Sequence, residues 1–276
     1  MYKIVDKKQL ASGITALDIE APLIAEKAMP GQFVVVIADE KSERIPLTIA
    51  DWDKQEGWIR IIVQEAGFST KKITNFSKGK NLFGVLGPLG HPSPVRKVGN
   101  FIGIGGGVGI AEMFPVARGY KEASNRVLTI IGARDKDTLI LEDKLKSVSD
   151  ELFVATDDGS KGEKGFVTDV LKDILDSHKE LNKDNTLIYA VGPVKMMEAV
   201  AKLSRDKNIK TLVSLNPIMV DATGMCGACR VVVGGKTRFA CVEGPEFDAH
   251  EVDFKSLLKR LDQHKNLEHK CKLTEY

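Results

Sequence analysis

Short apolar runs and polar breaks alternate over the first hundred residues, without a long stretch of helical periodicity. Within the runs, apolar and polar positions follow the two-residue period of half-buried strands, and turns containing Pro and Gly separate them. Short strands divided by such turns are typical of a small antiparallel barrel. We therefore predict a β-barrel domain over residues 1–98, with strands at residues 13–19, 32–37, 58–63 and 81–86.

Between residues 99 and 216 the pattern changes to apolar runs that alternate with helical stretches. This alternation predicts an α/β domain with an open parallel sheet and helices on both of its faces. The expected strands are residues 101–104, 127–131, 152–156, 186–190 and 211–215, and the expected helices are 110–122, 139–148, 166–175 and 194–207. We expect residues 217–276 to form a small C-terminal lobe and a tail.

Composition narrows the class of protein. The 40 basic and 38 acidic residues leave a net charge of +2 without a concentrated basic run, so nothing favours nucleic acid as a partner. The longest apolar runs are too short to span a bilayer, and the N-terminal residues lack the apolar core of a signal peptide. Four cysteines, three of them clustered, suggest metal binding in a reducing compartment. We therefore expect a cytoplasmic protein without a membrane partner.

A glycine-rich segment, GGGVG, follows the first expected strand of the middle region and precedes its first helix. Gly105, Gly106, Gly107 and Gly109 would let the backbone approach a pyrophosphate at a helix N-terminus. However, the glycines are not in the usual GxGxxG register, and a packing device explains them equally well.

Other loops fall where parallel strands should end, which is where such sheets bind ligands. Asp157, in TDDGSKGEKG (residues 156–165), and the turn of Gly192 and Pro193 are candidate contacts for a dinucleotide. Basic and acidic residues alternate over residues 134–137, so the charges leave the choice between NAD and NADP open.

Two segments of the barrel region resemble ligand loops: RIPLTIAD (residues 44–51) and GFSTKKI (residues 67–73). Free amide groups at the second segment are suited to a phosphate. Taken alone, the first is better explained as a β-bend and the second as a capped helix, with Ser69 or Thr70 as its N-cap. Ahead of a nucleotide motif they become candidate flavin contacts.

Near the C-terminus, Cys226, Cys229 and Cys241 have the spacing C-x2-C-x11-C, and Asp221 precedes Cys226 by the four-residue gap of a plant-type ferredoxin frame. The frame predicts an iron–sulfur site with an aspartate in place of the first cysteine. Zinc is the alternative, with Asp221, His250 or Cys271 as its fourth ligand. Asp221 is alternatively the N-cap of the following turn.

Taken in order, the motifs PLTI, GFSTKK, GPLG, GGGVGIAE, TDDGSKGEKGFVT, GPVKMM and CGAC resemble one family over almost the whole chain. It is the family of ferredoxin-reductase-like electron-transfer subunits, which includes the iron–sulfur subunit of dihydroorotate dehydrogenase B. Within it, the chain is most similar to the branch of NADH-dependent ferredoxin:NADP oxidoreductase small subunits, also called sulfide dehydrogenase beta subunits. That branch has Asp at the position of Asp221, where the dihydroorotate subunits have Cys.

The resemblance implies FAD on the barrel, NAD(H) on the middle domain and a [2Fe–2S] cluster in the C-terminal lobe. Thr48 is expected near flavin N5 as the catalytic hydroxyl, and Asp221, Cys226, Cys229 and Cys241 are expected to ligate the cluster. In the family, the Arg that binds the flavin phosphate often directly precedes the Pro. Here Ile45 stands between Arg44 and Pro46, so the chain departs from the family at this position. The full set of implied dinucleotide contacts is Arg44, Pro46, Leu47, Thr48, Gly67, Ser69, Thr70, Gly105, Gly106, Gly107, Gly109, Asp157, Gly192 and Pro193.

The expected function is therefore electron transfer between NAD(H), FAD and the cluster, in either direction. The expected partner is a larger subunit that holds flavin and [4Fe–4S] clusters, binds NADP(H) and exchanges electrons with ferredoxin, so that this chain forms the NAD branch of electron bifurcation. The alternatives are a dihydroorotate dehydrogenase B subunit, a sulfide dehydrogenase, a stand-alone ferredoxin–NADP reductase, and a zinc-containing nucleotide-binding protein without enzymatic activity.

Overall fold

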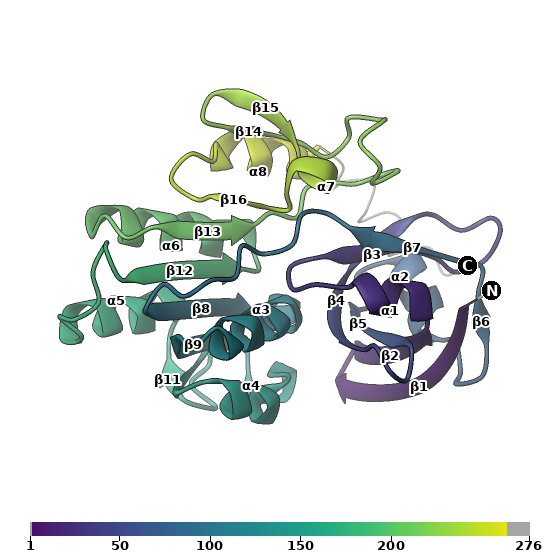
Figure 1. Ribbon diagram of the computed structural model, residues 1–276, viewed down its shortest axis with the longest axis horizontal. Coiled ribbons are helices and arrows are strands. Elements are labelled where there is room, and N and C mark those ends of the chain that lie inside the picture. The colour runs from purple at the N-terminus through teal and green to yellow at the C-terminus, as the bar shows by residue number, and fades with distance from the viewer. Residues whose placement is uncertain (1, 264–276) are drawn as a thin grey trace. The chain divides into compact units, whose positions relative to one another are not determined.

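The computed structural model describes residues 2–263, and the chain divides into two compact units (Figure 1). Unit 1 comprises the chain up to His91, Asn216–Pro245 and the chain from Asp253 onwards. Unit 2 comprises Pro92–Leu215 and Glu246–Val252.

A seven-stranded antiparallel sheet forms the larger part of unit 1 and curls into a nearly closed barrel (Figure 1). The order of its strands is β6-β1-β2-β5-β4-β3-β7, and two short helices, α1 (Pro22–Lys27) and α2 (Phe68–Thr74), accompany it. The predicted antiparallel barrel is thus confirmed. Its strands are β1 (Tyr2–Ala11), β2 (Ile14–Glu20), β3 (Phe33–Ile37), β4 (Ile45–Asp53), β5 (Trp58–Gln64), β6 (Asn81–Leu82) and β7 (Gly84–Leu89).

Strand β5 shows how the sequence pattern builds the barrel. Ile59, Ile61 and Val63 alternate along it and are fully buried in the apolar core. Between them, Arg60 makes two hydrogen bonds of 2.6 Å with the carboxylate of the buried Asp18 on β2. The barrel therefore has an apolar core, and the pair of Arg60 and Asp18 is largely shielded from water.

Unit 2 is built on a seven-stranded sheet with the order β11-β10-β9-β8-β12-β13-β16. All neighbouring strands are parallel except β16, which runs antiparallel to β13. Helices α3 and α4 lie on one face and α5 and α6 on the other, which confirms the predicted open sheet (Figure 1). The strands are β8 (Asn100–Gly106), β9 (Arg126–Ala133), β10 (Glu151–Thr156), β11 (Glu163–Lys164), β12 (Thr186–Val191), β13 (Thr211–Ser214) and β16 (Glu246–Asp248).

The helices of unit 2 follow the strands in the expected alternation. They are η1 (Gly107–Gly109), α3 (Ile110–Glu122), η2 (Lys136–Thr138), α4 (Glu142–Val148), α5 (Val167–Ser177) and α6 (Val194–Asp206). Each α-helix of this set contributes buried apolar residues, so the sheet is covered on both faces.

The C-terminal part of unit 1 contains a two-stranded hairpin of β14 (Arg230–Val233) and β15 (Lys236–Phe239), followed by α7 (Ala240–Glu243) and later by α8 (Phe254–Asp262). The range predicted for the C-terminal lobe, residues 217–276, also includes β16, which pairs with β13 in the sheet of unit 2. No helix in the described range 2–263 is both long and apolar enough to cross a membrane.

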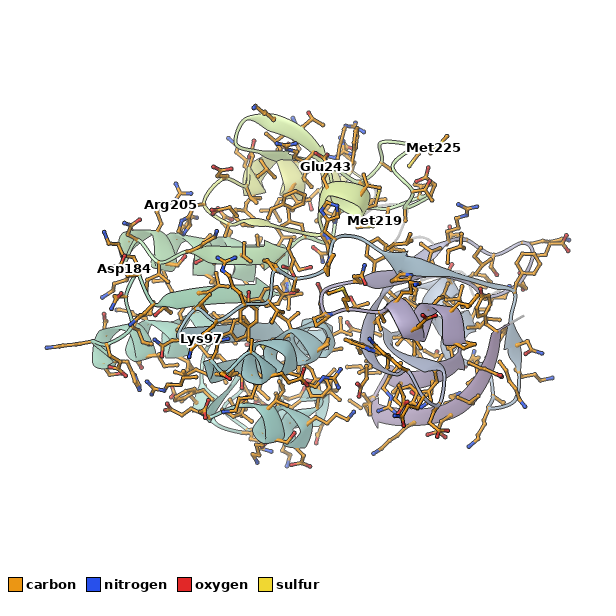
Figure 2. All side chains as sticks on the ribbon, in the orientation of Figure 1. Lys97, Asp184, Arg205, Met219, Met225 and Glu243 are labelled. Carbon is orange, nitrogen blue, oxygen red and sulfur yellow. The ribbon has the colours of Figure 1, made fainter. Side chains whose placement is uncertain are left out.

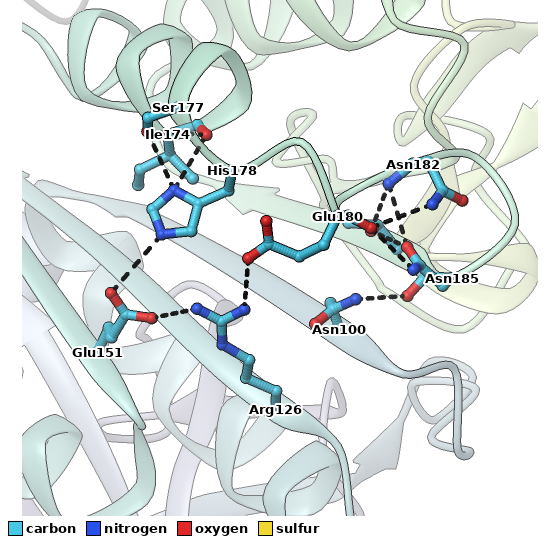
Figure 3. A network of polar contacts seen from close by, with 10 residues as sticks. Asn100, Arg126, Glu151, Ile174, Ser177, His178, Glu180, Asn182 and Asn185 are labelled. Atoms are coloured by element: carbon cyan, nitrogen blue, oxygen red, sulfur yellow. Dashed lines mark hydrogen bonds and ion pairs between the residues drawn. The ribbon is translucent and has the colours of Figure 1, made fainter.

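A polar network joins the amino ends of the parallel strands (Figure 3). Arg126, the first residue of β9, pairs with Glu151 at 2.6 Å and with Glu180 at 2.9 Å. Beside them, the Nδ2 of Asn100 donates to the carbonyl oxygen of Asn185 at 3.2 Å. Arg126 thus bridges two carboxylates at the amino ends of the strands. Sheets of this type bind ligands at the opposite edge, outside the carboxyl ends of the strands.

Candidate cofactor sites

Two glycine-containing loops meet at the carboxyl edge of the unit 2 sheet. The first joins β8 to α3 and the second joins β12 to α6. A Cβ atom on Gly109 would lie 2.6 Å from the carbonyl oxygen of Val191, and one on Gly106 would lie 2.5 Å from Sδ of Met196. Gly109 and Gly192 are therefore required because a Cβ atom on either would meet backbone atoms of the other loop, whereas a Cβ atom on Gly106 would first meet a flexible side chain.

Gly107 differs from its neighbours. It has a left-handed φ of +57°, and a Cβ atom there would meet nothing within 4 Å. It also begins η1, and no side chain caps either η1 or the adjoining α3. Open space beside uncapped amide groups at the start of a helix is suited to an anionic group such as a pyrophosphate. Of the four glycines of GGGVG, Gly107 has the surroundings of a ligand contact, whereas Gly105, Gly106 and Gly109 are packed.

The loops that follow β9 and β10 are joined to each other at the same edge. The N–H of Asp157 donates to the carbonyl oxygen of Ala133 at 3.1 Å, and the N–H of Lys136 donates to Oγ of Ser160 at 2.8 Å. Asp157 is exposed, so its carboxylate faces solvent at the carboxyl end of β10. In the loop between β12 and α6, Pro193 is the residue that directly precedes the helix.

In unit 1, the segment predicted to lie along a flavin forms the start of β4. Pro46 pairs with Val35 and Thr48 pairs with Phe33 of the neighbouring β3, and Leu47 lies between them. Arg44 stands just before the strand. All these residues except Arg44 therefore share one extended, hydrogen-bonded segment.

The loop before α2 is capped, but its N-cap residue is Gly67, whereas Ser69 and Thr70, the residues predicted as N-cap, lie inside the first turn of the helix. Oγ1 of Thr70 accepts from the N–H groups of Ala66 and Gly67 at 2.9 and 3.1 Å. Ser69, in contrast, is half-buried and donates to the carboxylate of Glu43 at 2.5 Å. A Cβ atom on Gly67 would meet nothing within 4 Å, so the backbone there is open to an approaching group.

The cysteine segment lies in the C-terminal part of unit 1. Cys229 and Cys241 are buried with their Sγ atoms 3.1 Å apart, and Cys226 is exposed. Burial, together with the neighbouring thiol of Cys229, raises the pKa of Cys241 to about 12. Glu243 accepts from the N–H of Phe239 at 2.6 Å and so fastens α7, which carries Cys241.

Asp221 holds the loop that leads into the first two cysteines. Its Oδ1 accepts from the N–H of Thr223 at 2.8 Å and its Oδ2 from the N–H of Cys226 at 3.0 Å, and these bonds lower its pKa. Left-handed glycines at 224 and 227 allow the tight turn, and the tip at Met225 is 86% exposed (Figure 2). The carboxylate thus caps this turn, the arrangement that was the alternative to ligation.

Comparison with known proteins decides the family. A Thermotoga maritima protein, described as a homologue of the electron transfer subunit of dihydroorotate dehydrogenase B (NAD(+)), is 46% identical over 97% of this chain and 93% of its own. The Bacillus cereus electron transfer subunit of that enzyme is 30% identical over 90% of this chain and 96% of its own. The chain belongs to the family of dihydroorotate dehydrogenase B electron-transfer subunits and their homologues.

Two further matches locate the parts of this family in the chain. Residues 104–202 match the oxidoreductase NAD-binding domain, and residues 216–253 match the iron–sulfur cluster binding domain of dihydroorotate dehydrogenase B. Among solved structures, a chain of the NADH-dependent reduced ferredoxin-NADP oxidoreductase superposes with a TM-score of 0.91 at 44% identity. That match covers 99% of this chain and 98% of the other.

The residues of the cysteine segment fit the cluster of this family by their chemistry. Thiolates are the usual ligands of iron–sulfur clusters, and two of the three thiols already touch. In the described range 2–263, no three His, Cys, Asp or Glu side chains are grouped to hold a metal ion as they stand. Of the zinc alternatives, His250 instead contacts Oγ of Ser204 at 3.0 Å, and Cys271 lies outside the described residues.

Sequence reasoning missed one polar cluster in unit 2. Glu112 on α3 and Glu246 on β16 gather with Ser93, Tyr189 and Ser214 inside the unit. These residues are scattered along the chain and belong to no motif. A glutamate among the buried residues at the start of α3 is the one signal that could have drawn attention to it.

Proposed function

We propose that this chain is the electron-transfer subunit of an oxidoreductase complex, exchanging electrons between NAD(H) and a partner subunit by way of FAD and a [2Fe–2S] cluster. The observation that carries the proposal is the combination within one chain of an open, uncapped Gly107 turn in a dinucleotide-type sheet with the paired thiols of Cys229 and Cys241. The first is suited to a dinucleotide phosphate and the second to a metal cluster.

The chain would have three functional domains. Residues 1–98 would bind FAD, residues 99–216 would bind NAD(H), and residues 217–276 would bind the cluster. In the first, the β4 segment of Pro46, Leu47 and Thr48 would contact the flavin, with Thr48 at its reactive edge. Arg44, Gly67, Ser69 and Thr70 would contact its phosphates. In the second, Gly107, Asp157 and the Gly192–Pro193 turn would position the nicotinamide dinucleotide.

A flavin supplies the step that neither other carrier can, since it accepts hydride from a nicotinamide and gives single electrons to a cluster. The residues of this chain have the tasks of positioning and shielding. The paired backbones at Gly106 and Gly192 fix the width of the nucleotide loop, because neither side can move inward. At the cluster, the Asp221 carboxylate would hold the 221–226 turn by accepting from the N–H groups of Thr223 and Cys226, and so position Cys226.

The partner is proposed from the relatives. Their names describe subunits of larger enzymes, and the 44% identical chain comes from an NADH-dependent reduced ferredoxin-NADP oxidoreductase. We favour a larger partner that holds flavin and [4Fe–4S] clusters and binds NADP(H), with ferredoxin reached through it. The dihydroorotate dehydrogenase B partner is the second candidate, and it is favoured by the name of the 46% identical relative.

The proposal is tested on the full-length chain, expressed together with the proteins encoded by the genes next to its own. Flavin absorbance, about two irons per chain and reduction of the flavin by NADH are expected. A chain that binds zinc and no flavin would contradict the proposal. For the partner, co-purification with an NADP(H)-binding flavoprotein supports the favoured candidate, and co-purification with a dihydroorotate-oxidising subunit supports the second. The variants Cys241→Ser and Cys271→Ser form a matched pair, since only the first should lose iron.

A further inference from the structure

Two glutamates belong to one polar cluster inside unit 2, on elements that are far apart in the sequence. Glu112 lies in the first turn of α3, and Glu246 is the first residue of β16. Oγ of Ser214 and the hydroxyl of Tyr189 donate to Oε1 of Glu112, the latter at 3.4 Å, while Oγ of Ser93 donates to Oε1 of Glu246. Three buried hydroxyl groups therefore donate hydrogen bonds to these two carboxyl groups.

The second oxygen of Glu246 has no such support. Although other atoms of the residue reach solvent, Oε2 is shielded from it, and no hydrogen-bond partner for it exists among the described residues. A carboxylate oxygen in that position is costly, whereas a protonated carboxyl group loses its charge. The geometry thus favours a neutral Glu246.

The charged and titratable groups around the pair do not offset its charge. The groups that act on Glu246 are Glu112 on α3, Tyr189 on β12 and Ser93, and none of them is basic. The pKa of Tyr120, also on α3, is raised to about 12, chiefly by burial. The charge of Glu246 raises this pKa further, and the charge of Arg96 lowers it. At the other end of β16, Asp248 accepts from the N–H of His250, and the pKa of that imidazole is lowered, first by burial and also by Arg205.

We propose that Glu246, shielded from solvent near the carboxylate of Glu112, is protonated in the folded chain, and that this proton holds β16 on the edge of the unit 2 sheet. The strand is only three residues long, and Glu246 is paired in register with Ser214, the same residue that donates to Glu112. Loss of the proton leaves two like charges in a poorly solvated cluster, at the residue where β16 begins. The proton would pass to bulk water, and the strand would separate from β13.

The direction of the pH dependence follows from the acid's environment. Burial, followed by the charge of Glu112, raises the pKa of Glu246 from 4.5 to about 8. The folded chain therefore holds a proton that the unfolded chain releases near its ordinary pKa. The stabilisation is fully present below that ordinary value and declines as the pH rises to about 8. Anchoring of β16 should weaken on the alkaline side.

The test is hydrogen exchange of the full-length chain at the amide groups of β16 and of Ala249, whose N–H donates to Thr211 at 2.9 Å. Between about pH 6 and about pH 9.5, protection corrected for intrinsic exchange should fall on the order of tenfold or more in the native chain. In Glu246→Gln it should fall less than about threefold, because the acid that releases the proton is gone. The matched control is Glu251→Gln, at an exposed residue of the same unit, which should behave as the native chain.

Infrared difference spectra provide a second measurement that does not depend on the variants folding. The native chain at neutral pH should show the C=O stretch of a protonated carboxylic acid, and the band should disappear as the pH is raised. Its absence at neutral pH, or protection that does not change with pH, would overturn the proposal. A titration midpoint that shifts with Na⁺, K⁺ or Ca²⁺ at constant ionic strength would overturn it too, since a cation would then hold the pair.

Discussion

The backbones of Gly106 and Gly192 are in such close contact that a Cβ atom on Gly192 would lie 2.9 Å from the carbonyl oxygen of Gly106. Gly192 also has a φ of +149°, a conformation that side chains rarely allow. Gly192→Ala should therefore lower the free energy of unfolding by about 1–3 kcal/mol, measured by chemical denaturation. Gly107→Ala, at the same edge of the sheet, is the control. It places a side chain on a left-handed backbone, which costs about 1–2 kcal/mol, but the added methyl group meets no neighbouring atom. A loss in Gly192→Ala no larger than the loss in Gly107→Ala would disprove the packing role.

Gly107 offers a second prediction, on binding. Because the space beside it is open, an added methyl group would enter the region proposed for the dinucleotide phosphate. We expect Gly107→Ala to weaken NADH binding roughly tenfold, which corresponds to about 1.4 kcal/mol. Fluorescence titration with NADH measures it. Gly235→Ala, at an equally open left-handed glycine between β14 and β15, should leave NADH affinity unchanged. An unaltered affinity in Gly107→Ala would place the phosphates elsewhere.

Asp221 allows its two roles to be separated by substitution. If its carboxylate ligates iron, Asp221→Cys should keep the cluster but shift its reduction potential and its EPR spectrum, since a soft thiolate replaces a hard oxygen. Asp221→Asn retains an acceptor for the amide groups of Thr223 and Cys226 but is a poor ligand. It should therefore lose iron while the turn persists. Native spectra in both variants would show that the carboxylate only caps the turn.

The pair of Asp18 and Arg60 should be important to the stability of the barrel. Asp18 is buried, and its hydrogen bonds raise the pKa of Arg60. Asp18→Ala leaves the guanidinium without its main partner, so we expect a loss of about 3–5 kcal/mol in the free energy of unfolding. Asp6→Ala removes a carboxylate from the exposed ion pair with Lys78 and should have little effect. A similar melting temperature for the two variants would contradict this assignment.

The sequence predicted the two sheet types well, because burial on one or both faces leaves a clear periodic pattern. It missed β1, where only Ile4 is fully buried and the other residues are largely solvated. It also missed β4 as a strand, because Pro46 argues against one. The structure shows why Pro46 is tolerated: the first part of β4 pairs with β3, and pairing with β5 begins only at Ile49.

The candidate sites were predictable where they follow motifs, and not where they depend on contacts between distant residues. GGGVG marked the nucleotide loop, but only the packing of Val191 and Gly192 shows that Gly106 and Gly109 serve structure and Gly107 is open. The cysteine spacing could not show that the Asp221 carboxylate binds the amide groups of its own loop. Glu112 and Glu246 share no motif at all, since their proximity is a product of the fold.

The position of β16 matters during synthesis. The sheet of unit 2 is completed by a strand that follows residues 216–245, so a ribosome must release the whole cysteine segment before that sheet can be finished. Until then β13 is an open edge that can pair with another nascent chain. A chain that stalls between Leu215 and Glu246 is therefore exposed to aggregation, and chaperones would be needed most during that interval.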